Sequence, residues 1–277
     1  QSGSIMMLEN IRFNQGEESN DNEFSKKLSN LGDIYVNDAF SCSHRSHASV
    51  EGITKYIPSY FGLQITQEIE ALKKITSEIT KPVSLIIGGS KISTKISIIN
   101  NLAKKFDNII IVGGMANTML KHTGYKIGKS ICENDSGPLI KEIFEISKKF
   151  NCKIVCPIDV VVSKSIEGAG KNKNIKEIND DEIILDIGPK TISSIKKIIN
   201  DSNTVLWNGP AGYFENPNFQ NGTKEILEII TQKTINDKIF SVAGGGETVA
   251  AINKFKKFDS FTFVSTAGGA FLEYLEG

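Results

Sequence analysis

The sequence predicts an α/β protein built on an open parallel sheet with helices on both faces. Three observations support this fold class. Short apolar runs of strand length alternate with stretches of helical periodicity, several runs end in glycine, and one of them continues directly into an amphipathic helix. Because right-handed crossovers place the carboxyl ends of parallel strands at one edge of a sheet, the glycine-bearing turns are expected to meet there.

The composition suits a folded protein with one large core or two modest ones. The chain has 277 residues, 39% of them hydrophobic, and a formal net charge of zero. A neutral chain has no electrostatic reason to bind nucleic acid or an acidic membrane surface, and its apolar runs are too short to span a bilayer. The four scattered cysteines (Cys42, Cys132, Cys152 and Cys156) form no disulfide pattern and no signal peptide opens the chain, so we expect a cytoplasmic protein.

The first part of the chain predicts a small α/β unit. Ile5–Leu8 has the composition of a strand, Phe24–Leu31 has the spacing of an amphipathic helix ended by Gly32, and Ile34–Val36 predicts a second strand. The chain starts within a step or two of a strand, without a capped helix before it. We therefore expect it to come from the middle of a longer protein.

A polar loop follows the second of these strands. Residues 37–40 lie at the carboxyl end of the strand, where open α/β sheets bind their ligands, and residues 41–49 hold one cysteine and two histidines around Arg45. A zinc site is one interpretation, but no second ligand cluster follows and an arginine between the histidines repels a cation. The favoured alternative is a loop that receives an anion, with Arg45 as the strong donor.

Residues 56–62 break the regular pattern and mark the expected domain boundary. A long helix is predicted after them, over Gln64–Glu78, because its apolar residues have helical spacing. Six apolar runs that predict strands then alternate with helical stretches: Val83–Ile87, Ile109–Val112, Lys153–Cys156, Thr204–Leu206, Ile239–Val242 and Phe261–Val264.

One strand–turn–helix segment has the features of a phosphate-binding site. An apolar strand, Lys238–Ala243, passes through three glycines into a helix, which leaves backbone N–H groups unpaired at a positive helix N-terminus. Gly244, Gly245 and Gly246 keep side chains away from a ligand, and Thr248 adds a hydroxyl in the first turn. The alternative for this segment alone is an ordinary tight turn in an α/β sheet.

Five such glycine-bearing turns are expected at one edge of the sheet, and five are hard to explain without a nucleotide. In the first turn, Lys91 and Lys95 are four residues apart, so they are predicted to share a helix face and to reach the same phosphate. A solvated lysine pair on an exposed helix is the alternative. The turns are Gly88-Gly89, Gly113-Gly114, Gly209, Gly244-Gly245-Gly246 and Gly268-Gly269.

Seven longer motifs run along the chain: LENIRF at 8–13, YVNDAF at 35–40, HRSHAS at 44–49, GGSKISTK at 88–95, DIGPKT at 186–191, WNGP at 207–210 and GGG at 244–246. In this order, and over essentially the whole chain, they resemble the phosphoglycerate kinase family. The resemblance implies a two-domain hinge kinase in which each domain is an open parallel sheet with helices on both faces, the first domain being incomplete here. It also implies glycolytic phosphoryl transfer between 1,3-bisphosphoglycerate and Mg-ADP, giving 3-phosphoglycerate and ATP.

The resemblance implies a division of the chain into two domains. Residues 1–62 would be the C-terminal half of the phosphoglycerate-binding domain, and residues 63–277 would be the nucleotide-binding domain. The latter would include an interdomain helix at about 63–80 and a hinge segment at about 265–277. The implied partners are ADP or ATP and the two phosphoglycerates, with Mg²⁺ as cofactor, and the full-length protein is expected to be a monomer.

Roles for single residues also follow from the resemblance. Arg12 and Arg45 would bind phosphoglycerate. Lys91 would contact nucleotide phosphates, and Lys95 would follow the transferred group. The implied nucleotide-binding set also includes Gly89, Gly113 and Gly114 around adenine, Asn208 near the phosphates, Glu215 on the ribose, and Gly245, Gly246 and Thr248 at the phosphate seat. Gly245 and Gly268 would join the two lysines in catalysis, and Glu247 would hold magnesium.

The sequence departs from the family pattern at three positions. The family usually has aspartate where this chain has Glu247, and it has smaller residues where this chain has Ala267 and Phe271. Family members also begin roughly a hundred residues earlier, about half a domain, and continue past Gly277. We therefore expect the chain by itself not to turn over substrate. The alternative function is a catalytically impaired, kinase-derived nucleotide-binding module.

Overall fold

The computed structural model describes residues 3–237 and 239–277, and the chain divides into two compact units. One unit ends at Glu70 and the other begins at Ala71. The division falls inside helix α3 (Leu63–Thr76), rather than at residues 56–62 as expected from the sequence.

The larger unit is built on a six-stranded sheet in which all paired strands are parallel. Each of the six apolar runs expected to form strands contributes one strand, with ends that differ by up to two residues. Lys238, expected in one run, lies outside the described residues. In spatial order the strands are β11 (Phe263–Ser265), β10 (Phe240–Gly244), β9 (Thr204–Asn208), β3 (Val83–Ile87), β4 (Asn108–Ile111) and β5 (Lys153–Val155).

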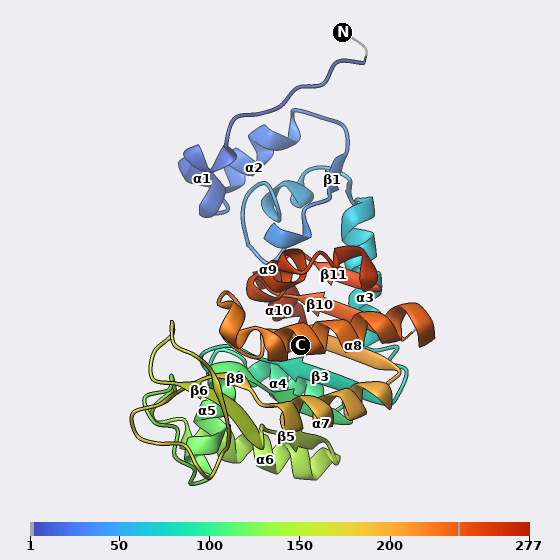
Figure 1. The fold of residues 1–277 in the computed structure, drawn as a ribbon. Helices are drawn as coiled ribbons and strands as arrows, with labels where there is room; N and C mark the ends of the chain where they lie inside the picture. Colours follow the sequence, from blue (N-terminus) through green and yellow to red (C-terminus); the bar gives the residue numbers. More distant parts are fainter. Residues whose placement is uncertain (1–2, 238) are drawn as a thin grey trace. The chain divides into compact units, whose positions relative to one another are not determined.

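Three helices pack on one face of this sheet. Residues of α7 (Pro189–Asn200), α8 (Asn221–Asp237) and α9 (Gly246–Lys254) share a buried core with Val205 and Trp207 of the central strand β9. Figure 1 shows α7 and α8 lying side by side across the strands. This core fixes the strand order near the glycine-bearing turns.

The opposite face of the sheet is covered as well, as the fold class predicts. Successive side chains of a strand point to opposite faces, and Leu85 and Ile87 of β3 are as fully buried as their neighbours. On this side α4 (Ile96–Ala103) packs against α6 (Gly137–Phe150) and α10 (Gly269–Glu276). Burial on both faces explains why the strands appear in the sequence as continuous apolar runs.

A second sheet of this unit is antiparallel and is missed by the sequence analysis. Its strands are β6 (Asp159–Ser163), β7 (Lys171–Asn174) and β8 (Ile183–Ile187), in the order β7-β6-β8. β7 is mostly exposed and has the sequence Lys-Asn-Lys-Asn, so it carries no apolar pattern. Helix α5 (Gly113–His122) contacts β8, and two 3₁₀ turns complete the unit, η4 (Pro217–Phe219) and η5 (Phe258–Ser260).

The smaller unit contains two short parallel strands, β1 (Tyr35–Asn37) and β2 (Ser59–Phe61). β2 lies within the segment that the sequence predicts as a break in the pattern. The unit also contains the first part of α3 and five short helices: η1 (Ile11–Phe13), α1 (Gln15–Glu18), α2 (Asn22–Ser29), η2 (Phe40–Cys42) and η3 (Gly52–Lys55).

Two predictions for this unit are wrong in detail. Ile5–Leu8 is exposed and forms no strand, because no described segment pairs with it. The helix predicted at Phe24–Leu31 begins earlier, since the Asp21 carboxylate accepts a hydrogen bond from the Phe24 N–H over 2.7 Å and caps α2. It ends at Ser29.

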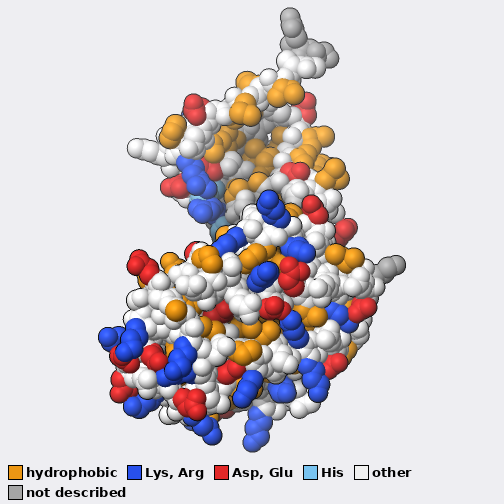
Figure 2. Space-filling view, viewed as in Figure 1, with side chains coloured by type: hydrophobic (Ala, Val, Ile, Leu, Met, Phe, Trp, Pro, Cys, Tyr) orange, Lys and Arg blue, Asp and Glu red, His pale blue; other side chains and the backbone are white. Residues whose placement is uncertain are grey.

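Apolar side chains are exposed on the smaller unit, and among them Ile34 and Val36 are 61% and 54% exposed. Hydrophobic groups are accordingly visible on the surface of residues 3–70 in Figure 2, whereas acidic and basic side chains alternate over the visible face of the larger unit. None of the helices in the described part of the chain combines the length and the apolar character needed to cross a membrane.

Candidate functional site

The glycine-bearing turns after β3, β4 and β9 are joined by backbone contacts. The Gly88 N–H donates to the Asn208 carbonyl over 2.8 Å, and the Met115 N–H donates to the Gly89 carbonyl over 2.8 Å. A Cβ at Gly88 would lie 2.5 Å from the Pro210 carbonyl oxygen, so glycine is required for this approach. The parallel sheet therefore brings these turns together at one edge, as the sequence predicts.

The turns after β9 and β10 are joined by side chains. The Asn208 amide donates to the Gly244 carbonyl over 2.7 Å, and the Gly209 N–H donates to the Thr248 hydroxyl over 2.7 Å. Asn208 and Thr248 are both buried. Their polar groups hold two turns in register, so the Thr248 oxygen that was expected at a phosphate already accepts a bond within the protein.

The β10–α9 turn has the geometry expected of an anion seat. Gly245 has φ of +95°, and a Cβ there would lie 2.5 Å from the Asn208 amide nitrogen. At Gly246, the first residue of α9, a Cβ would meet no described atom within 4 Å, so the helix N-terminus is open. Glu247 is exposed in this first turn.

Lys95 is directed into this group of turns. Its ammonium donates to the Gly88 carbonyl over 2.6 Å and to the side-chain oxygen of Asn208. Burial lowers the pKa of Lys95 from its ordinary 10.5 to about 8, and the nearby Glu247 carboxylate opposes this shift. The cation therefore lies among the turns that the sequence assigns to phosphate binding.

The prediction that Lys91 and Lys95 share a helix face is wrong. Helix α4 begins only at Ile96, and Lys91 is exposed in the loop before it. The loop departs from a helix because Ile92 is buried and because the Ser93 N–H and hydroxyl both donate to the Glu133 carboxylate, the N–H over 3.0 Å.

The fifth turn, after β11, stands apart from these contacts. Gly268 has φ of +59°, and a Cβ there would meet no described atom within 4 Å. Ala267 is buried. Phe271 is fully buried, and a Cβ on Gly244 would lie 2.5 Å from its ring. Because β10 and β11 are parallel, their carboxyl ends lie at the same edge of the sheet, and Gly268 lies at that edge with the other turns.

A cavity of about 440 Å³ opens beside these turns. Of the predicted site residues, it is lined by Gly89, Gly113, Gly114, Glu215 and Glu247. Much of its remaining wall is apolar and comes from the small antiparallel sheet and from adjoining loops, which the sequence analysis did not assign to the site. These wall residues include Ile131, Val160, Ile184, Leu185, Pro210 and Tyr213.

Asp186 is a wall residue whose role the sequence analysis missed. Its carboxylate accepts a hydrogen bond from the Gly222 N–H over 2.7 Å, which caps helix α8. Burial raises the pKa of Asp186 to about 7, and backbone N–H groups at residues 187, 221 and 222 oppose this rise. The Tyr213 N–H donates to the Leu185 carbonyl over 2.7 Å. This bond and the bond from Gly222 to Asp186 hold the two ends of the loop that carries Glu215.

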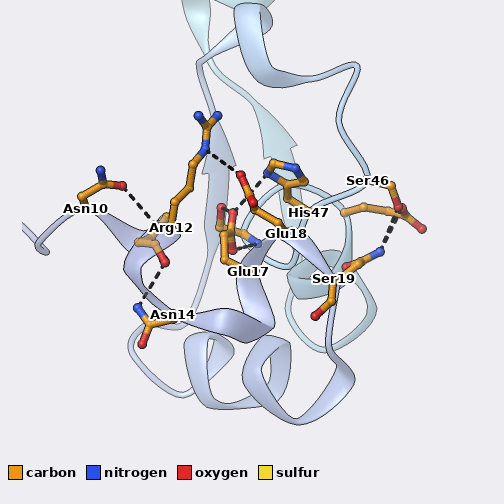
Figure 3. A network of polar contacts seen from close by, with 12 residues as sticks. Asn10, Arg12, Asn14, Glu17, Glu18, Ser19, Ser46 and His47 are labelled. Carbon is orange, nitrogen blue, oxygen red and sulfur yellow. Dashed lines mark hydrogen bonds and ion pairs between the residues drawn. The ribbon is translucent and has the colours of Figure 1, made fainter.

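The two residues predicted to bind phosphoglycerate lie in the smaller unit, and Figure 3 shows one of them, Arg12. Arg12 belongs to η1, and its Nε atom lies 4.0 Å from the Glu18 carboxylate. Arg45 is exposed and lines a separate cavity of about 480 Å³ with His44 and Ser46. Arg12 does not line that cavity. His47, considered above as a zinc ligand, lies 3.7 Å from Glu17.

The chain was compared with known protein families, and the family model described as "Phosphoglycerate kinase" matches residues 1–277. The chain belongs to the phosphoglycerate kinase family. It is therefore a member of a family of glycolytic transferases that transfer a phosphoryl group.

Relatives and solved structures agree with the membership. The phosphoglycerate kinase of Xanthobacter autotrophicus is 45% identical over all of this chain and 70% of its own length, and that of Wolbachia pipientis is 47% identical over 99% of this chain. The solved phosphoglycerate kinase of Coxiella burnetii has a TM-score of 0.92 at 40% identity, covering 97% of this chain and 69% of its own. The Pyrococcus horikoshii structure has a TM-score of 0.83 at 30% identity, covering 100% and 71%.

Two of the residues that depart from the phosphoglycerate kinase pattern, Ala267 and Phe271, fit the fold without strain or exposure. Among the described non-glycine residues, positive φ occurs at Asn20, Asp135, Asn151 and Lys256, so Ala267 carries its Cβ on an ordinary backbone. The Phe271 ring is enclosed against Gly244 and is not exposed at the sheet edge. Both residues are therefore accommodated by the fold.

Glu247 is the residue that could hold magnesium. It lines the cavity, it is exposed, and it lies in the first turn of α9 beside the open helix N-terminus. A single carboxylate fits magnesium in a nucleotide site, since this ion usually keeps water and phosphate oxygens as its other ligands. Within residues 3–237 and 239–277 no group of three or more His, Cys, Asp or Glu side chains forms a metal site.

Proposed function

We propose that residues 71–277 bind ADP or ATP in the cavity of about 440 Å³, with the phosphates at the meeting of the glycine-bearing turns. The observation that carries this proposal is the lining of one cavity by Gly89, Gly113, Gly114 and Glu215, which come from three different turns. Glycines have no Cβ atoms, so the flat base of a nucleotide can lie close to their backbone at the apolar wall. The Glu215 carboxylate can accept hydrogen bonds from the ribose hydroxyls.

The phosphates would extend from the cavity toward the N-terminus of α9. Gly245 and Gly246 offer backbone N–H groups and the positive end of a helix there, and Asn208 and Thr248 hold the seat in shape. Lys91, exposed in the neighbouring loop, would contact the phosphates, and Gly268 would lie at the same edge. Glu247 would hold Mg²⁺, which supplies positive charge to the phosphate oxygens when bound.

The chemistry needs positioning more than a nucleophile on the protein. The acyl phosphate of 1,3-bisphosphoglycerate is already activated, and a terminal oxygen of ADP attacks its phosphorus while the carboxylate of 3-phosphoglycerate leaves. Lys95 would leave its two oxygen acceptors, Gly88 and Asn208, and follow the transferred group with its positive charge. Gly245 would stabilise the same charge with its backbone N–H.

The phosphoglycerate would bind to the smaller unit. Arg12 and Arg45 are both exposed there, and a substrate with a phosphate and a carboxylate needs several charge-assisted bonds. We assign the phosphoglycerate-binding part to residues 1–62 and the nucleotide-binding part to residues 63–277, with an interdomain helix near residues 63–80 and a hinge near residues 265–277. We further propose a cytoplasmic, monomeric enzyme that binds neither nucleic acid nor membranes. The alternative of an impaired nucleotide-binding module has no observation in its favour.

Calorimetric titration of Mg-ADP into the protein tests the nucleotide site. We expect saturable binding of one nucleotide with a Kd between about 1 μM and 1 mM, the usual range of substrate affinities. The Glu215→Ala variant should bind more weakly, by about tenfold, because it lacks the ribose contact. Glu276→Ala, an exposed glutamate at the end of α10, is the matched control and should bind like the wild type. Absence of heat at millimolar Mg-ADP would refute the nucleotide site.

A further inference from the structure

Glu17 is a buried carboxylate in the smaller unit for which the proposed chemistry has no direct use. It lies in α1, a helical turn of four residues, and only 2% of it is exposed. One carboxylate oxygen accepts from the Ser49 N–H over 3.0 Å, and the other accepts from the Ser49 hydroxyl over 2.6 Å. Its backbone carbonyl accepts from the Ala48 N–H over 2.9 Å. Both the side chain and the backbone of Glu17 therefore hold residues 48–49.

These bonds connect the two segments that carry the arginines. Arg12 lies in η1, and the next helical turn, α1, follows directly because Asn14 ends the first and begins the second. Arg45 lies in the loop that Glu17 holds, and the His47 N–H donates to the Arg45 carbonyl over 3.0 Å. In Figure 3, Glu17 lies between the segment that carries Arg12 and the side chain of His47.

The residue that directly follows Arg45 is also fixed. The Ser46 hydroxyl is bonded to Glu51, and the Asn20 amide donates to Ser46 over 3.0 Å and to Glu51 over 3.1 Å. The Arg45 side chain itself is exposed. A loop that is held directly after an exposed guanidinium helps to keep that group in place for an incoming anion.

Burial of a carboxylate is costly, and a packing role alone would be served better by an apolar side chain. Glu17 also differs from its neighbour Glu18, which is exposed and lies 4.0 Å from Arg12. Because the oxygens of Glu17 are occupied by Ser49 and face His47, they do not compete with a substrate for the arginines.

We propose that Glu17 is a positioning residue for the phosphoglycerate site. It fixes the Arg12 segment to the Arg45 loop, so that two guanidinium groups meet a single substrate with two anionic groups. The inference rests on the proposed phosphoglycerate site, and it concerns the geometry of that site rather than any direct contact between Glu17 and substrate.

The test compares Glu17→Gln with Glu18→Gln, the adjacent exposed glutamate, by NMR titration with two probes. 3-Phosphoglycerate carries two anionic groups and needs both arginines in place, whereas inorganic phosphate can bind to either one alone. We expect Glu17→Gln to raise the Kd for 3-phosphoglycerate by about tenfold or more, since misplacement of a binding group is costly. Its Kd for phosphate should change by less than about twofold, and Glu18→Gln should keep the full preference for 3-phosphoglycerate.

A second variant, Ser49→Ala, removes one of the two bonds to the Glu17 carboxylate and should give a smaller loss with the same pattern. If Glu17→Gln does not fold, the same titrations of Ser49→Ala test the positioning role. Equal weakening of phosphate and 3-phosphoglycerate, or wild-type binding of 3-phosphoglycerate by both variants, would overturn the positioning role. A wild-type protein that binds no 3-phosphoglycerate would instead overturn the phosphoglycerate site, a result distinguishable from the others.

Discussion

Lys95 is a largely buried cation beside the proposed nucleotide site. Its ammonium is bonded to two oxygens of the turns after β3 and β9. Burial holds its pKa at about 8. A nucleotide phosphate placed beside it would favour the charged form and raise this pKa.

We therefore predict that binding of Mg-ADP takes up protons near pH 8. The free protein is partly deprotonated at Lys95 there, and the complex is protonated, so affinity should fall as the pH rises above about 8. Calorimetry at pH 8 in two buffers of different ionisation enthalpy measures the uptake. In Lys95→Ala the uptake should disappear, whereas Lys104→Ala, an exposed lysine at the end of α4, should retain it. No uptake by the wild type would contradict the assigned role.

Gly89 and Gly113 could be placed at the sheet edge from the sequence because each lies just after the end of a strand. Glu17 and Asp186 could not be predicted, because their partners lie 32 and 36 residues away in the chain and the intervening fold is needed to bring them together. A buried carboxylate and an exposed one look alike in a polar stretch such as residues 15–18.

At the scale of elements, the β10–α9 turn depends on glycine at one position much more than at the next. Gly245 has φ of +95° and a close neighbour in the Asn208 amide, whereas Gly246 begins the helix with free space around its Cα. A side chain at Gly245 would therefore strain the backbone and displace Asn208.

We predict that Gly245→Ala lowers the free energy of unfolding by about 1–3 kcal/mol, the usual cost of such a strained backbone. Gly246→Ala should leave stability nearly unchanged, because its Cβ meets no described atom within 4 Å. Urea unfolding of the two variants and the wild type gives the comparison. Equal stability of the two variants would show that the turn is not constrained as described.

The six strands of the large sheet could be predicted because they are buried on both faces and therefore appear as apolar runs. The three strands β6, β7 and β8 could not, since β7 is mostly exposed and polar. The sequence analysis placed Lys91 and Lys95 in a helix, whereas α4 begins only at Ile96. The residues before α4 form a loop in which Ser93 is bonded to Glu133, a partner 40 residues away that the local sequence does not reveal. Long-range polar contacts of this kind leave no periodic signal.

At the scale of the whole molecule, we propose that the two units bind different substrates. Residues 71–277 contain the glycine-bearing turns and the cavity proposed for the nucleotide. Residues 3–70 contain Arg12 and Arg45 and expose many apolar side chains. If each substrate binds to one unit, each ligand should stabilise the backbone of its own unit.

Amide hydrogen exchange with each ligand added separately tests this assignment most directly. We predict that Mg-ADP slows exchange in residues 88–95, 113–117, 207–215 and 244–249 and leaves residues 40–50 unchanged, because a ligand suppresses local opening where it binds. We predict that 3-phosphoglycerate slows exchange in residues 10–18 and 43–49 and leaves the nucleotide turns unchanged. Protection of residues 43–49 by Mg-ADP alone, with no protection at the glycine-bearing turns, would contradict the account.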